Sequence, residues 1–207
     1  MDDLANDILR LAREMTGKVS SDEQFHFGRR AYHVGKLWGL MKKDRSIYET
    51  DVLTPSDLKT LIQILDPDEI PGRITLITRL GVDRIETVLP PLIESVLSLG
   101  RNVLWSCDPM HGNTETLISG IKTRRFENIL KEMELCFDIH AASGSSLGGV
   151  HLELTGENVT ECTGGAGGLQ DEDLGRAYQS QVDPRLNGEQ GLEMAFSIIR
   201  KKRRMAS

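Results

Sequence analysis

Apolar residues recur at helical spacing in five stretches of the chain. Leu4, Ile8 and Leu11 predict a helix over residues 3–16, and TPSDLKTLIQILD predicts one with Thr54 as N-cap and Pro55 at its first position. Further helices are expected over 83–99, from TRRFENIL to a stop at Gly144, and after an N-cap at Asn187. Helices therefore fill much of the chain.

Three short runs rich in β-branched and apolar residues lie between these helices, at about 73–79, 102–108 and 149–155. In the last run Val150, Leu152 and Leu154 alternate with His151 and Glu153, which predicts a strand with two different faces. Strands that alternate with helices favour a parallel α/β arrangement. An eight-stranded barrel usually takes about 250 residues, so the pattern is typical of part of one.

Polar residues follow the predicted strands. The apolar run before Cys107 ends in DPMHGNT, which includes His111, while Glu153 lies near the end of the last strand and Asp183 precedes a proline. Imidazole and carboxylates suit Mn²⁺, Fe²⁺, Co²⁺ or Zn²⁺, so these residues are a candidate metal site. By spacing alone, a salt bridge of Glu153 and a turn at Asp183 are equally simple explanations.

Basic residues near the same strand ends offer cations for phosphate or carboxylate groups. Arg79 follows the first strand, and Lys122, Arg124 and Arg125 lie in a predicted loop before a helix. The alternative for this basic run is a solvated helix start. Residues 18–49 interleave basic and aromatic side chains, which fits an anion-binding surface or a partly buried helix or strand.

The composition is that of an ordinary globular protein, with 39% hydrophobic and 27% charged residues. A net charge of −6 argues against nucleic acid as a partner. No apolar run reaches the roughly 18 residues that a membrane span needs, and the acidic N-terminus resembles no targeting peptide. Three cysteines form no disulfide framework, and Cys136 is expected to be a buried hydrophobe. A cytoplasmic location is expected.

Five motifs carry a resemblance to a known family: PGRITLITRLG, VLWSCDPMHGNT, GIKTRRFENIL, GGVHLELTGENVTEC and DPRLNGEQGLEMAF. In order and spacing they resemble the C-terminal part of the class II (plant-type) 3-deoxy-D-arabino-heptulosonate 7-phosphate (DAHP) synthases, from about Thr54 to Ile199. The resemblance implies a (β/α)₈ TIM barrel and a divalent metal such as Mn²⁺ or Co²⁺. It also implies the first step of the shikimate pathway to chorismate and the aromatic amino acids, in which phosphoenolpyruvate condenses with D-erythrose 4-phosphate and phosphate is released.

The resemblance also implies roles for individual residues. His111, Glu153 and Asp183 match three of the four metal ligands, and Arg79 matches a phosphoenolpyruvate-binding arginine. Lys122 and Arg124 are assigned to substrate binding as helpers, together with Arg125.

Some positions depart from the family. Its fourth metal ligand is a cysteine in the N-terminal barrel half, for which this chain has no counterpart. Tyr48 stands where the family has a substrate-binding lysine, and Val182 stands where it usually has a cysteine. Cys107 is expected in the core or behind the metal ligands.

The sequence thus predicts an α/β fold in two parts: an N-terminal helical segment over 1–50, and the C-terminal half of a DAHP synthase barrel over 51–207. One hypothesis is a metal-dependent synthase whose site is completed by a second copy or by a partner that supplies the N-terminal half. The other is a non-catalytic half-barrel that binds a partner such as a full-length shikimate-pathway enzyme. Neither nucleic acid nor a membrane is expected as a partner.

Overall fold

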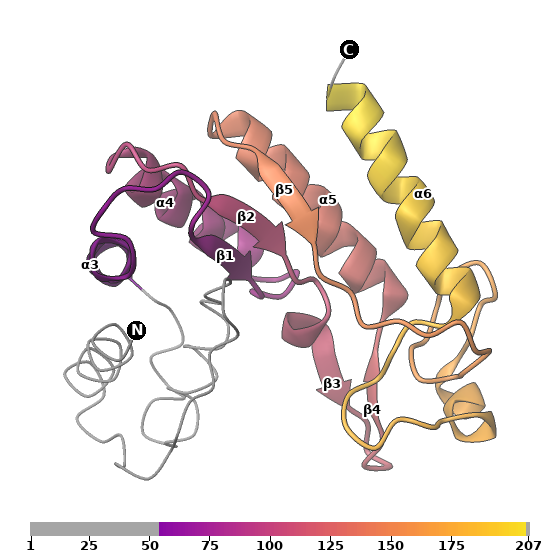
Figure 1. The fold of residues 1–207 in the computed structure, drawn as a ribbon. Helices are drawn as coiled ribbons and strands as arrows, with labels where there is room; N and C mark the ends of the chain where they lie inside the picture. The colour runs from indigo at the N-terminus through magenta and orange to yellow at the C-terminus, as the bar shows by residue number, and fades with distance from the viewer. Residues whose placement is uncertain (1–53, 206–207) are drawn as a thin grey trace, which may run out of the picture. The chain divides into compact units, whose positions relative to one another are not determined.

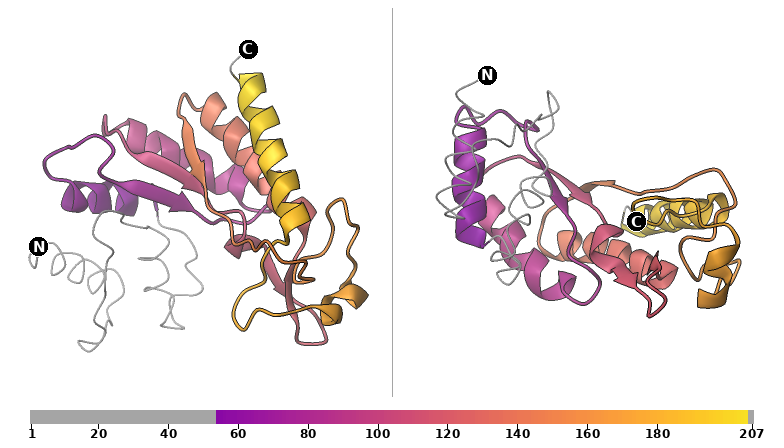
Figure 2. Two further views of the ribbon diagram at one scale, coloured as in Figure 1. Left: turned by 45° about the vertical axis from the view of Figure 1, so that its right-hand side comes forward. Right: turned by 90° about the horizontal axis from the view of Figure 1, so that it is seen from below.

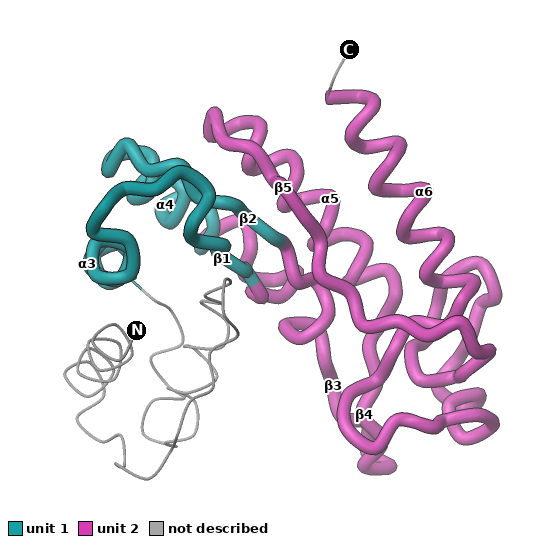
Figure 3. Tube along the Cα trace, in the orientation of Figure 1, with its two compact units in different colours: residues 1–78, 88–106 teal, residues 79–87, 107–207 magenta. Residues whose placement is uncertain are grey.

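The computed structural model describes residues 54–205, which fall into two compact units (Figure 3). Unit 1 comprises residues 54–78 and 88–106, and unit 2 comprises residues 79–87 and 107–205. The predicted helix over 3–16, the segment 18–49 and Tyr48 lie outside the described residues. Among the helices of residues 54–205, none has the length and apolar character needed to cross a bilayer.

Unit 1 is built from α3 (Pro55–Leu65), β1 (Thr75–Thr78), most of α4 (Ile85–Leu97) and β2 (Leu104–Cys107) (Figure 1). β1 and β2 are neighbouring strands, and Leu104 donates its backbone N–H to the carbonyl of Ile74 at 2.9 Å. The two helices and the strands bury one apolar core, to which α3 contributes Leu58, Leu61, Ile62 and Leu65.

Unit 2 contains the helices α5 and α6, which lie side by side in both Figure 1 and Figure 2. α5 also packs on β5, so it forms the centre of the unit. Its buried side chains are mostly apolar, among them Phe126, Ile129 and Met133. The elements of the unit are η2 (His111–Asn113), β3 (Thr114–Thr116), β4 (Lys122–Arg124), α5 (Phe126–Ala142), β5 (Leu147–Val150), η3 (Asp171–Arg176) and α6 (Gly188–Met205).

The structure confirms the predicted helices among the described residues. Thr54 caps α3 and exchanges hydrogen bonds with Asp57, which forms a capping box. α5 ends just before Gly144, which has a φ of +67° that favours glycine. Asn187 caps α6, because its Oδ1 accepts the backbone N–H of Gln190 at 2.9 Å. The fold is mixed α/β, as expected.

Two local predictions are wrong. Residues 111–120, expected as a loop, and residues 122–125, expected as a loop or a solvated helix start, instead contain the antiparallel pair β3 and β4, with Thr114 opposite Arg124 and Thr116 opposite Lys122. The last strand is Leu147–Val150 rather than 149–155, and the expected alternation fails because Leu154 is 54% exposed. Leu154 instead forms an isolated parallel bridge with Leu186, so pairing with a distant segment decides the conformation there.

Candidate metal centre

Three side chains from separate segments of unit 2 converge on one point. His111 lies in η2, Glu153 follows β5, and Asp183 lies in the loop before α6. Nε2 of His111 is 3.3 Å from a carboxylate oxygen of Glu153 and 3.9 Å from one of Asp183. One donor atom of each residue lies within 4.8 Å of the other two. The predicted trio is therefore brought together.

The expectation that all three residues end strands holds only in part. β2 leads to Asp108 and then to His111, and β5 leads to Glu153. Asp183 does not follow a strand: it lies in a bend of the chain. Side-chain contacts hold the loop of Asp183 instead. Its backbone pairs with another segment three residues later, where Leu186 forms a β-bridge with Leu154.

Asp108 fixes the ring of His111. Its Oδ1 accepts the backbone N–H groups of Met110 and His111 at 3.0 and 3.1 Å. Its Oδ2 lies 2.7 Å from Nδ1 of His111, so Nδ1 is the donor and Nε2 is left facing Glu153 and Asp183. A carboxylate behind a histidine in this way orients metal-binding imidazoles and strengthens them as ligands.

The charges of these groups depend on one another. The hydrogen bond to Asp108, followed by that to Glu153, raises the pKa of His111 to about 9. The hydrogen bond from His111, supported by Arg124, lowers the pKa of Glu153 to about 2. Burial opposes ionisation of Asp108 most strongly, but the hydrogen bonds and the charge of His111, together with the backbone N–H of Met110, outweigh it and lower the pKa of that carboxyl. At neutral pH the ring of His111 is therefore a cation between the carboxylates of Asp108 and Glu153.

Arg124 lies behind Glu153 and is completely buried. Its Nη1 donates to Glu153 at 2.6 Å and to the carbonyl of Pro184 at 2.5 Å, while its Nε donates to Thr114 at 2.8 Å. Among the described residues its Nη2 has no hydrogen-bond partner. Because it contacts both the Glu153 and the Asp183 segments, this arginine fixes their spacing.

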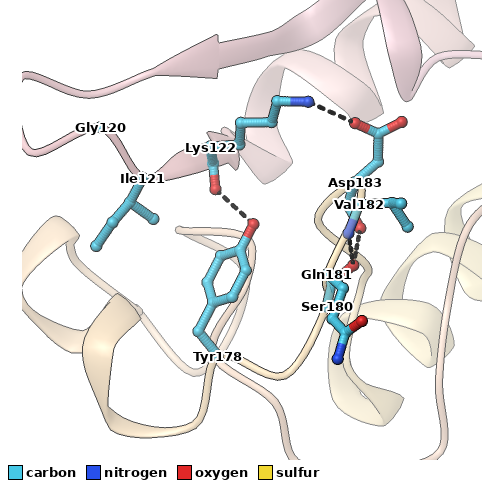
Figure 4. A pocket seen from close by; sticks show the side chains of 8 residues that line it. All are labelled: Gly120, Ile121, Lys122, Tyr178, Ser180, Gln181, Val182 and Asp183. Carbon is cyan, nitrogen blue, oxygen red and sulfur yellow. Dashed lines mark hydrogen bonds and ion pairs between the residues drawn. The ribbon is translucent and has the colours of Figure 1, made fainter.

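Lys122 lines a cavity of about 670 Å³ beside the trio (Figure 4). Figure 4 shows its ammonium group pointing toward Asp183, at 3.4 Å from Oδ1. Tyr178 donates its hydroxyl to the carbonyl of Lys122 at 2.9 Å, and Ser180 donates to the carbonyl of Asp183 at 2.7 Å. A half-exposed cation and a candidate metal ligand thus share one cavity.

Arg79 and Arg125 differ in how far they are already engaged. Arg79 is half-buried, and its side chain forms no ion pair with any residue between 54 and 205. Arg125 pairs with Glu115 at 2.6 Å and with Asp171, whose hydrogen bond is the main cause of its raised pKa. Arg79 is therefore available to an anion, whereas Arg125 serves to tie η3 to the start of α5.

Two buried glutamates behind the site had no assigned role from the sequence. Glu132 on α5 and Glu161 in ENVTEC are both fully buried. Glu132 accepts the backbone N–H groups of Leu80 and Gly81, whereas Glu161 accepts N–H groups from the loop that carries Asp183. The sequence does contain a signal for Glu132, because this residue lies three positions after Ile129 and therefore falls on the apolar face of its helix.

All three cysteines of the chain are buried, and none belongs to a group of candidate metal ligands among the described residues. A hydrogen bond with Cys136, together with burial, raises the pKa of Cys107. Burial raises the pKa of Cys162 to about 12. The predictions that Cys136 is a small buried hydrophobe and that Cys107 is core are confirmed.

The donor set fits a divalent cation. An imidazole nitrogen and two carboxylate oxygens within reach of one point suit Mn²⁺, Fe²⁺, Co²⁺ or Zn²⁺. A second group, formed by Asp108, His111 and His151, shares His111 with the first. Because Nδ1 of His111 is occupied by Asp108 while Nε2 faces Glu153 and Asp183, the geometry favours the group with these two carboxylates.

The sequence was compared with those of known families and proteins. Residues 47–199, about three quarters of the chain, match the family described as the Class-II DAHP synthetase family. The chain belongs to this family. It is 48% identical to phospho-2-dehydro-3-deoxyheptonate aldolase AroG of Mycolicibacterium smegmatis over 145 residues, which are 70% of this chain and 31% of that protein.

Other relatives of the same name give a similar result. The identity is 50% with the Neurospora crassa protein and 46% with the Streptomyces coelicolor protein, each over 145 residues. These matches cover 69% and 70% of this chain, and 30% and 32% of the two relatives, respectively. The chain thus spans about a third of the length of the curated relatives that it matches, and that third includes the candidate metal centre.

Proposed function

We propose that this chain forms the metal-binding, C-terminal part of a DAHP synthase, which condenses phosphoenolpyruvate with erythrose 4-phosphate. The observation that carries the proposal is the convergence of His111, Glu153 and Asp183, with Asp108 behind the imidazole. These three residues would hold a divalent metal, Mn²⁺ or Co²⁺ by analogy with the family. The fold is accordingly proposed to be the C-terminal half of a (β/α)₈ barrel.

The bound cation would polarise the aldehyde oxygen of erythrose 4-phosphate as a Lewis acid. C3 of phosphoenolpyruvate would then attack the aldehyde carbon, water would add at C2, and phosphate would leave. Arg79, which has no ion pair within residues 54–205, is proposed to bind the carboxylate or phosphate of phosphoenolpyruvate. The fixed cations reduce the cost of bringing two anionic substrates together.

Lys122 is proposed to bind a substrate phosphate from the cavity wall, since its ammonium is half-exposed beside Asp183. Arg124 belongs to the same site but is buried behind Glu153. Because its side chain is buried and bonded to Glu153, it is proposed to act on the substrates by holding that carboxylate in place.

Three protein donors leave coordination positions for the substrate and for a further ligand. The chain's own cysteines belong to no ligand group among the described residues. We therefore propose that the fourth protein ligand comes from a second copy or from a partner chain that completes the site.

Metal titration of the purified chain tests the proposal. We expect Mn²⁺ to bind with a stoichiometry of one, as followed by the loss of the free-ion electron paramagnetic resonance signal, and His111→Ala to weaken binding by at least about a hundredfold. Phosphate release from the two substrates should be sensitive to a chelator. If the wild-type chain binds no divalent ion, the proposal is wrong.

A second candidate function, a non-catalytic half-barrel that binds a full-length enzyme of the family, is favoured by one observation. Leu192, Phe196 and Ile199 form an exposed apolar strip along α6. Size-exclusion chromatography with light scattering, with and without such an enzyme, separates the two functions. Complex formation by a His111→Ala variant that has no turnover would support the second one.

A further inference from the structure

Glu132 is a charged residue on the apolar face of α5. Its neighbours on this face, Ile129, Met133 and Cys136, are buried as well. A carboxylate is expensive to bury unless its oxygens accept hydrogen bonds, so its position requires an explanation. Glu132 belongs to no group of candidate metal ligands among the described residues.

The partners of Glu132 come from two different loops. Its Oε1 accepts the backbone N–H groups of Leu80 at 3.1 Å and Gly81 at 3.0 Å, which directly follow Arg79. Its Oε2 accepts the side-chain amide of Asn113 at 2.6 Å, two residues after His111. One carboxylate thus holds the segment that follows Arg79 and the segment with the candidate metal ligand His111.

The two loops also contact each other directly. Oδ1 of Asn113 accepts the backbone N–H of Val82 at 3.0 Å. A Cβ atom on Gly81 would lie 2.8 Å from the carbonyl oxygen of Gly112, and one on Gly112 would lie 2.9 Å from Cα of Gly81. The two backbones therefore come into contact at two residues that have no side chain. The hydrogen bonds to Glu132 hold the two loops together at this contact.

We propose that Glu132 is a positioning residue that sets Arg79 at a fixed place relative to His111, so that a bound metal and a bound anion meet in one geometry. The inference rests on the proposed function. Glu132 acts through Asn113 and through the backbone of residues 80–81. Because both loops share this one acceptor, ordering of His111 by a cation is transmitted to the segment that follows Arg79.

Hydrogen exchange of the full chain tests this coupling, with Mn²⁺ alone as the probe. In the wild type, saturating Mn²⁺ should slow exchange in a peptide that covers residues 79–84 by about tenfold, which is the worth of one hydrogen bond to a charged group. In Glu132→Gln, which keeps one acceptor oxygen but cannot accept from both Asn113 and the backbone, the same peptide should show no Mn²⁺-dependent slowing.

Ile129→Val is the matched control, because it alters the same buried face of α5 and neither side chain can hydrogen-bond to either loop. It should keep the Mn²⁺-dependent protection even if it lowers the melting temperature as much as Glu132→Gln does. Equal loss of protection in both variants would mean that Glu132 contributes only stability, and the inference would be overturned.

Phosphoenolpyruvate binding in the presence of Mn²⁺ gives a second readout. Glu132→Gln should raise the dissociation constant about tenfold in the wild-type background and should have no further effect once Arg79 is replaced by alanine. Equal effects in both backgrounds would overturn the inference. If the wild type binds no Mn²⁺, the proposed function fails and the inference with it, whereas Mn²⁺ binding without coupling overturns the inference alone.

Discussion

The candidate metal centre has two sides, that of His111 and that of Asp183, and each is held by a buried glutamate, but the two carboxylates are kept in place by different means. Glu161 faces the guanidinium of Arg185, which donates to both of its oxygens at 2.7 and 2.9 Å. It also accepts the backbone N–H groups of Gln179, Ser180 and Arg185. From the part of the chain that the structure describes, Glu132 accepts only neutral N–H donors.

The difference appears in the pKa values. Burial opposes ionisation of Glu161 most strongly, but the hydrogen bonds from Arg185, Gln179 and Ser180 together outweigh it and lower the pKa of that carboxyl. Burial dominates at Glu132 and raises its pKa to about 7, despite the three N–H donors. A permanent cation thus secures the Asp183 side, while the His111 side depends on a carboxylate that titrates near neutrality.

The largest expected effect is an opposite pH dependence of stability for the two glutamine variants. The contribution of Glu132 to stability is complete below its ordinary pKa of 4.5 and is lost as the pH rises to about 7, which amounts to about 3 kcal/mol. Urea denaturation should therefore find Glu132→Gln gaining stability relative to the wild type over this range.

Glu161→Gln should behave in the opposite way. A depressed pKa stabilises the fold above the ordinary value, and this stabilisation disappears as the pH falls through the folded-state pKa. The variant should therefore lose stability relative to the wild type as the pH rises from strongly acidic values. If the stability of both variants relative to the wild type changed in the same direction with pH, the proposed difference between Glu132 and Glu161 would be contradicted.

The next largest effect is expected from removal of His111, which both groups of candidate metal ligands share. His111→Ala should weaken Mn²⁺ binding by at least about a hundredfold, since even residues behind metal ligands cost up to that much. Isothermal titration calorimetry measures the change. His151→Ala is the control, because His151 belongs only to the second ligand group, and this variant should bind as the wild type does.

Breaking the charged pair should have a smaller effect. Glu161→Gln at pH 7 should lower the free energy of unfolding by about 2 kcal/mol, because Arg185 and the backbone donors lose a charged acceptor. It should also weaken Mn²⁺ binding through the loop of Asp183, as seen in the same calorimetric titration. A destabilised variant with unchanged affinity would show that the loop holds Asp183 without this pair.

The smallest effect is expected at Asp108. Asp108→Asn keeps an oxygen acceptor for Nδ1 of His111, but it removes the carboxylate whose hydrogen bond contributes most, and whose charge also contributes, to the raised pKa of that ring. The pKa of His111 should fall from about 9, as followed by nuclear magnetic resonance of its ring protons. Mn²⁺ affinity should fall by about tenfold. An unchanged pKa would contradict the part assigned to this carboxylate.

Local patterns predicted the helices and the approximate positions of the strands. The apolar spacing in α3 and α5 and the caps at Thr54 and Asn187 depend on neighbours within a few residues, so the sequence was sufficient there. β3 and β4 have three residues each, and the basic run of β4 was interpreted as a helix start. Such short strands have no periodicity of their own.

At the site, the motifs identified the candidate ligands but not what holds them. Pairs such as Glu161 with Arg185 or Arg124 with Glu153 join residues 24 and 29 positions apart, and nothing in the local pattern indicates them. Only Glu132 could have been found, because a charge on the buried face of an amphipathic helix is a visible conflict. Its three donors come from loops whose approach the sequence does not specify.

The contact between Gly81 and Gly112 limits which sequences this site can explore. A side chain at either position would have to push the two backbones apart, and Gly81 also has a φ of +84°. In a saturation library, both positions should therefore return only glycine, whereas Gly120, with nothing within 4 Å of its missing Cβ, should return asparagine as well. Directed evolution of this site would therefore have to keep both glycines and change only the side chains around them.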